Sequence, residues 1–212
     1  MDQEKLQEFE PIFYPESIAV VGASKDEWKF GTRYLRALTT SGFEGPLYPV
    51  NPGGGEILGL KAYPNLTSIP GPVDYVIISI PAQYIPDLLD DCTRKGVKVV
   101  QMFTAGFSET GEEEGRRLEG EIVKKAQEGG FRIIGPNCIG VYTPAHHMPY
   151  GPMEFSGEAG SVAFISQSGG VAGNFIEEGI RRGIQFSKAV SFGNGCDLDS
   201  IDYLENLAVD PE

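Results

Sequence analysis

Two segments of the chain combine glycine and hydroxyl residues in the way that phosphate-binding loops do, and the first of them also has a lysine. In the first, Val21 leads into Gly22-Ala23-Ser24-Lys25, and Gly31 opens the next amphipathic stretch. A glycine at the end of a strand lets the backbone approach a phosphate, and the amides of the following helix add donors and partial positive charge. No glycine stands between Gly22 and Gly31, so the GxGxxG dinucleotide fingerprint is absent. We therefore predict an anion-binding loop at residues 22–25.

The second segment, Ile165-Ser166-Gln167-Ser168-Gly169-Gly170, lies between an apolar run and a helical pattern. An anion at such a helix N-terminus gains roughly 0.3–1 kcal/mol, and up to about 2 kcal/mol when it is partly buried. Neither Ser166 nor Ser168 has a glycine two residues before it, so the GxSxG motif of serine hydrolases is absent. We predict a phosphate-stabilising turn here. A simple N-cap role for Ser168 remains the alternative.

The ends of the other expected strands have small or turn-forming residues. These are Val50, Asn51 and Pro52; Ile80 and Pro81; Phe103, Thr104 and Ala105; and Asn137 and Cys138. Such residues at one edge of a sheet suit a long ligand that lies across it. NAD-binding proteins usually have an acidic residue at the end of the second strand, where this chain has Asn51. Cys138 is a lone small residue beside Asn137, and we favour a packing role for it over nucleophilic catalysis.

The composition excludes several classes of function. The 212 residues contain 17 Lys and Arg against 30 Asp and Glu, for a net charge of −13. No broad basic face can therefore neutralise nucleic acid or an anionic membrane. With 41% hydrophobic residues the chain can form a core, yet no apolar run reaches the roughly 18–20 residues that span a bilayer. We expect neither a nucleic-acid nor a membrane partner.

Cysteine and histidine usage indicates a reducing compartment and no metal centre. Cys92, Cys138 and Cys196 are odd in number and widely spaced, which fits neither a disulfide framework nor a Cys-x-x-Cys site. The two histidines, His146 and His147, lie in a Pro-rich segment, and we expect both to be solvated loop residues. Residues 1–10 are acidic and lack the pattern of a secretory signal. The cytoplasm is the expected location.

Short β-branched runs alternate with amphipathic stretches about every 25 residues, a pattern typical of a doubly wound, Rossmann-like α/β fold with a parallel sheet. Expected strands span 17–21, 47–50, 75–80, 98–103 and 132–134, and expected helices span 31–40, 85–95 and 112–128. Gly42, Gly96 and Gly129 each lie just past a helix, where a left-handed capping residue is favoured.

The periodicity disappears after residue 142, and Pro and Gly become frequent. We predict a first domain over 1–145, a linker over 146–160 and a second domain over 161–212. In the second domain we expect strands at 161–166 and 188–192 and helices at 169–182 and 199–207. Two strands are few for an open α/β sheet. This part is therefore expected to be an incomplete domain.

The order of the motifs is more specific than any one of them. The motifs are SIAVVGAS, YPVNP, ISIPA, MFTAGF, IIGPNCIG, GSVAFISQSGG and SFGNGCDLD. This series resembles the NDP-forming acyl-CoA synthetases, the superfamily of ADP-forming acetate–CoA ligase and the succinyl-CoA synthetase α subunit, over nearly the whole chain. The resemblance implies a CoA-binding domain followed by the N-terminal part of a flavodoxin-like, succinyl-CoA-synthetase-like domain.

The resemblance also implies roles for the residues above. Coenzyme A would contact residues of the first domain: Gly22, Ala23, Ser24, Lys25, Val50, Asn51, Pro52, Ile80, Pro81, Phe103, Thr104, Ala105, Asn137 and Cys138. Its thiol end would approach Asn137 and Cys138. Ser166, Ser168, Gly169 and Gly170 would stabilise a phosphorylated histidine. Lys25, Lys29 and Arg33 are the nearest cations to the phosphates.

The family reaction converts a carboxylic acid, CoA and ATP into acyl-CoA, ADP and phosphate through an acyl phosphate and a phosphohistidine. The family's histidine lies well downstream of SQSGG, beyond residue 212, and the ATP-grasp module, with its ATP or ADP and Mg²⁺, is also missing. We thus assign no catalytic residue and expect this chain alone to be inactive. An ATP-grasp domain or subunit is the expected partner, and a homo-oligomer is an open expectation. An NAD(P)-dependent oxidoreductase and a non-catalytic CoA-sensing module are the alternatives.

Overall fold

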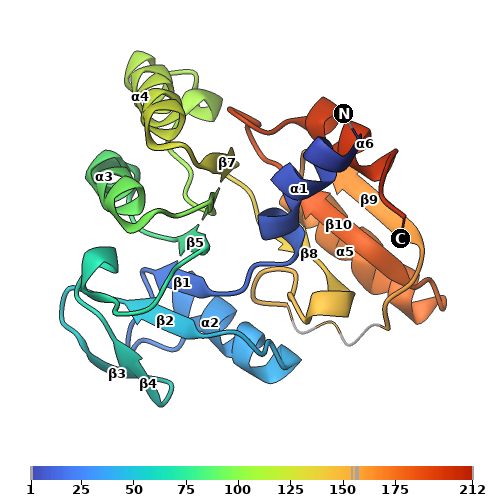
Figure 1. Cartoon of the computed structure of the whole chain (residues 1–212), viewed down its shortest axis with the longest axis horizontal. Helices are drawn as coiled ribbons and strands as arrows, with labels where there is room; N and C mark the ends of the chain where they lie inside the picture. Colours follow the sequence, from blue (N-terminus) through green and yellow to red (C-terminus); the bar gives the residue numbers. More distant parts are fainter. Residues whose placement is uncertain (1, 154, 156–157, 212) are drawn as a thin grey trace.

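The computed structural model describes residues 2–153, 155 and 158–211, which form two β-sheets covered by helices (Figure 1). The larger sheet has five parallel strands in the order β2-β1-β5-β6-β7. The strands are β1 (Ile18–Val21), β2 (Leu47–Val50), β5 (Tyr75–Ile78), β6 (Val99–Met102) and β7 (Arg132–Ile134). The α/β, Rossmann-like fold expected from the sequence is confirmed.

Alternate residues of these strands face two different helix layers. In β1, Ile18 and Val20 pack with the first core cluster, which includes residues of α2, whereas Ala19 and Val21 pack with the second, which includes residues of α3 and α4. The helices are α2 (Phe30–Ser41), α3 (Ile85–Lys95) and α4 (Glu113–Gly129). Strands buried on both faces explain the continuous apolar runs in the sequence.

A reversal of strand order lies between β1 and β5. After β2 the chain forms a short antiparallel hairpin, β3 (Gly55–Ile57) with β4 (Leu60–Ala62), and Tyr63 then makes a parallel bridge to Val50. The chain next crosses to the other side of β1 to form β5. In doubly wound sheets, ligands bind at the carboxyl ends of the strands where the order reverses.

The smaller sheet has the order β8-β10-β9, with β8 antiparallel and β9 parallel to β10. Its strands are β8 (Gly140–Tyr142), β9 (Val162–Ser166) and β10 (Phe186–Ser191), and its helices are α5 (Gly169–Arg181) and α6 (Ser200–Leu207). Helix α1 (Asp2–Phe13) packs against α6 and β8, at the junction of the two sheets (Figure 1). β8 lies within 1–145, so the range expected for the first domain contributes a strand to the second sheet.

The predicted elements end within two residues of the observed ones, and four details of the prediction are wrong or incomplete. Helix α1, the β3–β4 hairpin and β8 were not expected. The left-handed cap of α4 is Gly130, not Gly129, which is the last helical residue.

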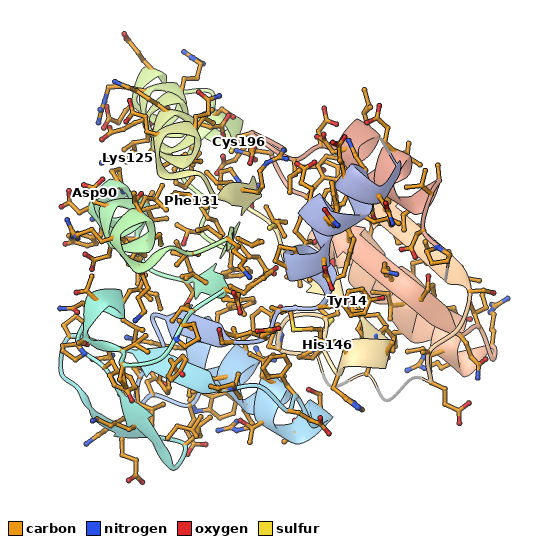
Figure 2. All side chains as sticks on the ribbon, in the orientation of Figure 1. Tyr14, Asp90, Lys125, Phe131, His146 and Cys196 are labelled. Carbon is orange, nitrogen blue, oxygen red and sulfur yellow. The ribbon has the colours of Figure 1, made fainter. Side chains whose placement is uncertain are left out.

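His146 is not a solvated loop residue. Its ring packs edge-on against Tyr14 and Phe43, and its Nε2 lies 2.8 Å from the Pro15 carbonyl oxygen. Figure 2 shows Tyr14 and His146 beside each other where α1 ends. His147 is exposed. The segment expected as a linker therefore packs on the fold, with Met148 and Tyr150 fully buried, while its residues 154, 156 and 157 lie outside the described part of the chain.

Two negative findings apply to the described residues. No helix among them is long and apolar enough to cross a membrane. Within the same residues, no group of three or more His, Cys, Asp or Glu side chains is placed to hold a metal ion.

Candidate functional site

The loops that follow the five parallel strands meet at one edge of the sheet, and hydrogen bonds connect them. Asn51 Nδ2 donates to the Ala23 carbonyl (2.8 Å), which joins the loops after β2 and β1. Thr104 Oγ1 donates to the Ile80 carbonyl (2.7 Å), and the Asn137 amide donates to the Thr104 carbonyl (2.9 Å). The residues predicted at the strand ends therefore form one continuous row across the sheet edge.

The loop after β1 is shaped by close contact with the loop after β5. Gly22 has a φ angle of +99°, and a Cβ atom there would lie 2.5 Å from the Ser79 carbonyl oxygen. Beyond it, the Ser24 amide donates to Thr32 Oγ1 (3.0 Å), and Thr32 Oγ1 donates to the Ser24 carbonyl (2.9 Å). The predicted anion-binding loop is thus tied to the first turn of α2. Ser79 was not predicted.

Positive charge is available beside this loop. Lys25, Lys29 and Arg33 are exposed, and none of them forms an ion pair with another described residue. Arg36, by contrast, is paired with Glu27 at 2.7 Å. Lys29 is the N-cap of α2 and makes no side-chain capping bond, so the first amides of the helix are not capped by it. This corner of the sheet edge can therefore bind an anion despite the net charge of −13.

A cavity of about 420 Å³ joins this sheet edge to the start of α5. It is lined by both predicted groups of site residues, namely Phe103, Thr104, Ala105, Asn137 and Cys138 from the first group and Ser168, Gly169 and Gly170 from the second. Ile139 and Gln167 complete the lining and were missed, although they lie inside the motifs IIGPNCIG and ISQSGG. The other predicted residues lie outside the lining: Gly22, Ala23, Ser24, Lys25, Val50, Asn51, Pro52, Ile80, Pro81 and Ser166.

At the start of α5, the two serines are used by the turn itself. Ser168 is the N-cap, and its hydroxyl oxygen accepts from the Val171 amide (3.3 Å). The Ser166 hydroxyl accepts from the Ser168 amide (3.1 Å) and donates to the Ser168 carbonyl (3.0 Å). The Gly169 and Gly170 amides have no acceptor among the described residues. The anion-binding capacity of this turn therefore rests on the glycine amides.

Residues of the second sheet hold the opposite wall in place. Ser191 Oγ, on β10, accepts from the amides of Ile139 and Gly140, both at 3.1 Å. Tyr150 OH donates to the Gly169 carbonyl (3.0 Å), so a residue from the expected linker fixes the start of α5. The cavity is therefore built by both parts of the chain.

The turn after β10 fastens the cavity loops together. The Gly193 amide donates to the Gln167 carbonyl (3.1 Å), and Gln167 Nε2 donates to the Gly193 carbonyl (3.0 Å). The Asn194 amide donates to the Pro136 carbonyl (2.9 Å). Gly193 has a φ of +60°, and a Cβ atom there would lie 2.1 Å from the Pro136 oxygen. Only glycine fits this approach, which brings the two loops into contact.

A carboxylate supports the loop after β6. Glu109 accepts from the Gly106 and Phe107 amides, and Asn194 Nδ2 donates to Glu109 (2.6 Å) and to Glu119 (2.7 Å). Partial burial disfavours the charged form of Glu109, but these hydrogen bonds outweigh it and lower its pKa below the ordinary value. Glu109 was not predicted, and Asn194 was noted in the sequence only as part of the motif SFGNGCDLD.

Cys138 is a packing residue, as the sequence indicated. It is 3% exposed, and its Sγ lies 3.5 Å from the carbonyl oxygens of Met102 and Ile134. Burial raises the pKa of the thiol to about 12, so the thiolate is scarce at neutral pH. Nucleophilic catalysis by Cys138 is therefore disfavoured.

Comparison with known proteins gives two consecutive family matches. Residues 16–144 match the model of the CoA binding domain, and residues 159–212 match that of the succinyl-CoA ligase like flavodoxin domain. Helix α1 precedes both matched ranges.

The chain is also similar to larger proteins over almost its whole length. It is 44% identical over 197 residues to the ADP-forming acetate–CoA ligase II α subunit of Pyrococcus furiosus, covering 93% of this chain and 42% of that protein. It is 41% identical over 201 residues to the ADP-forming acetate–CoA ligase I of Archaeoglobus fulgidus, covering 95% and 29%.

Among solved structures, the dinucleotide forming acetyl-coenzyme A synthetase 1 of Ca. Korarchaeum cryptofilum, in complex with phosphate and ADP, matches with a TM-score of 0.90. The identity is 39%, and the match covers 96% of this chain and 43% of that one. The chain thus spans between 29% and 43% of the length of these three relatives.

Proposed function

This chain belongs to the family of CoA-binding domains, and from that premise we propose that it is the CoA-binding portion of an ADP-forming acid–CoA ligase. The observation that carries the proposal is the cavity in which the ends of β6 and β7 meet the start of α5. A CoA thiol and a phosphorylated group must come together in such a ligase. In this chain the loops suited to each of them line the same space.

We place the CoA phosphates on the loop at residues 22–25, with Lys25 as the principal cation. The nucleotide would lie across Asn51 and Pro52, and the pantetheine would follow the hydrogen-bonded row of loops through Ile80 and Thr104. This route ends at Asn137, on the wall of the cavity. Lys29 and Arg33 add positive charge beside the phosphates, which favours a polyanionic ligand at this corner of the sheet edge.

The acid substrate is proposed to be a small monocarboxylate. Among the described residues no Lys, Arg or His side chain lines the cavity, so none of them would bind a second carboxylate there. The Gly169 and Gly170 amides, at the positive end of the α5 dipole, would stabilise a phosphoryl group. A phosphohistidine and an ATP-grasp module with Mg²⁺ would come from other segments or subunits. By this proposal the described residues alone do not catalyse acyl-CoA formation. The complete enzyme is proposed to act in the cytoplasm.

Isothermal titration of the chain with CoA, dephospho-CoA and NADH tests the proposal. CoA is expected to bind more tightly than NADH, and Lys25→Ala to weaken CoA binding about 5- to 30-fold, since one charge-assisted phosphate contact contributes about 1–2 kcal/mol. Lys124→Ala, on the far helix α4, is the matched control and should leave binding unchanged. Preference for NADH would instead support an oxidoreductase, and binding of neither ligand would refute a CoA site.

A further inference from the structure

Asn137 differs from the other residues of the cavity wall in its backbone conformation. Its φ angle is +57°, in the left-handed region that non-glycine residues rarely adopt. Two contacts keep it there. Its amide donates to the Thr104 carbonyl (2.9 Å), and the turn at Gly193 packs against its carbonyl group. Strained conformations of this kind concentrate at ligand-binding positions, where the surrounding structure maintains them.

The side chain of Asn137 holds no other part of the described chain by a hydrogen bond. Asparagines in other loops use their carboxamides locally: Asn51 bonds the Ala23 carbonyl, Asn65 caps a turn at Ser68, and Asn194 bonds two glutamates. The Asn137 carboxamide is exposed, lies on the cavity wall, and makes no hydrogen bond with any described residue. A conformational cost is therefore maintained at a residue whose donor and acceptor are available to a ligand.

The surroundings indicate which ligand group this carboxamide meets. The described part of the chain brings no charged side chain to the lining, and the phosphoryl group in our proposal would lie on the Gly169 and Gly170 amides, on the other wall. The ligand group that the Asn137 carboxamide would meet is therefore a neutral hydrogen-bond acceptor near the end of the pantetheine. We propose that Asn137 Nδ2 donates a hydrogen bond to the thioester carbonyl oxygen of bound acyl-CoA, an inference that rests on the proposed CoA site. Asn137 then distinguishes the acylated from the free cofactor.

The test compares acetyl-CoA with S-ethyl-CoA, in which a methylene replaces the thioester carbonyl. One added hydrogen bond of ordinary strength corresponds to about 3- to 10-fold in affinity. Calorimetry of the wild-type chain should show acetyl-CoA binding tighter than S-ethyl-CoA by that factor. Asn137→Gly accepts a positive φ without strain and Asn137→Asp keeps the shape without the donor. Both variants should abolish the difference between the two ligands, because each loses more affinity for acetyl-CoA than for S-ethyl-CoA.

Asn65→Gly, in a loop distant from the cavity lining, is the matched control and should keep the wild-type ratio. Equal binding of the two ligands by the wild-type chain overturns the inference and leaves the CoA site intact. An equal loss of CoA, S-ethyl-CoA and acetyl-CoA binding in Asn137→Gly also overturns it, because the carboxamide would then contact the pantetheine. If the wild-type chain binds none of the three, the proposed function itself fails.

Discussion

At Gly22, the conformation and the surroundings both require a residue without a side chain. The φ angle is +99°, and any Cβ atom would press on the Ser79 carbonyl at 2.5 Å. Because this contact is to backbone, the neighbour cannot move away by a rotamer change. We expect Gly22→Ala to lower the free energy of unfolding by about 2–4 kcal/mol, measured by urea denaturation.

Gly130→Ala is the matched control for this prediction. Gly130 also has a positive φ, +71°, but a Cβ atom there would have no heavy atom within 4 Å. The expected loss is therefore only the conformational part, about 1 kcal/mol. Equal losses in the two variants would show that the Ser79 contact contributes nothing.

Single residues divide into those that local sequence reveals and those that it does not. Gly22 and Gly169 could be predicted because a glycine turn between a strand and a helix has a local signature. Ser79 and Asn194 could not, because their roles are contacts with residues 57 and 85 positions away. No spacing rule connects such distant positions. The carboxyl-end loops meet only once the sheet order is known.

The loop after β6 is an element whose conformation depends on one carboxylate. Glu109 accepts hydrogen bonds from Gly106, Phe107 and Asn194, and its pKa is lowered by them despite partial burial. A lowered pKa stabilises the fold above the unfolded value of about 4.3 and loses that effect as the pH falls through the folded value. We expect the stability difference between wild type and Glu109→Gln to be largest near neutral pH and to shrink in acid.

Urea unfolding between pH 7 and pH 3 measures this difference directly. Glu113→Gln, an exposed glutamate at the start of α4 with no ion pair to a described residue, serves as the control. Its stability difference from wild type should change less with pH. If the stability difference between wild type and Glu109→Gln stays constant down to pH 3, the charged Glu109 carboxylate does not stabilise this loop.

Elements with a repeating apolar pattern were predicted within two residues, because burial against a sheet or helix leaves a local period. The elements that were missed have no such period. Strands β3, β4 and β8 have three residues each, and β8 is defined by pairing with β10 some 50 residues later. Helix α1 is acidic and contains Pro11, and its buried Phe9, Ile12 and Phe13 depend on partners far along the chain.

At the scale of the whole molecule, one hydrophobic core crosses from the first sheet to the second. The cluster contains Ile18 of β1, Tyr34 of α2, Phe13 of α1, Val190 of β10 and Tyr203 of α6. Residues predicted to belong to two domains are therefore packed into a common interior. We expect a single cooperative unfolding transition, with the near-ultraviolet circular dichroism of buried tyrosines such as Tyr34 and Tyr203 and the far-ultraviolet circular dichroism of the whole chain changing together.

The edge of the first sheet is closed by Asp197 from the second part of the chain. Its carboxylate accepts from the Ile133 amide of β7 (2.7 Å) and from the Arg132 guanidinium at 3.0–3.2 Å, while Arg132 also pairs with Glu8 of α1. The Arg132 and Asp197 side chains are only about a quarter exposed. Removing the Asp197 carboxylate therefore leaves the Ile133 amide and the Arg132 guanidinium without this acceptor. We expect Asp197→Ala to lower the free energy of unfolding by about 1–3 kcal/mol.

Asp197→Asn separates the two contributions of this contact, because the carboxamide oxygen can still accept from the Ile133 amide while the charge is lost. Asp197→Asn should therefore lose only about half of the free energy of unfolding that Asp197→Ala loses. Glu114→Ala, which breaks an exposed ion pair with Arg117 within α4, should leave the stability nearly unchanged. Since the turn at residues 193–197 also positions the cavity wall, Asp197→Ala should weaken CoA binding as well. Wild-type stability in Asp197→Ala would show that the shared core alone holds the two sheets together.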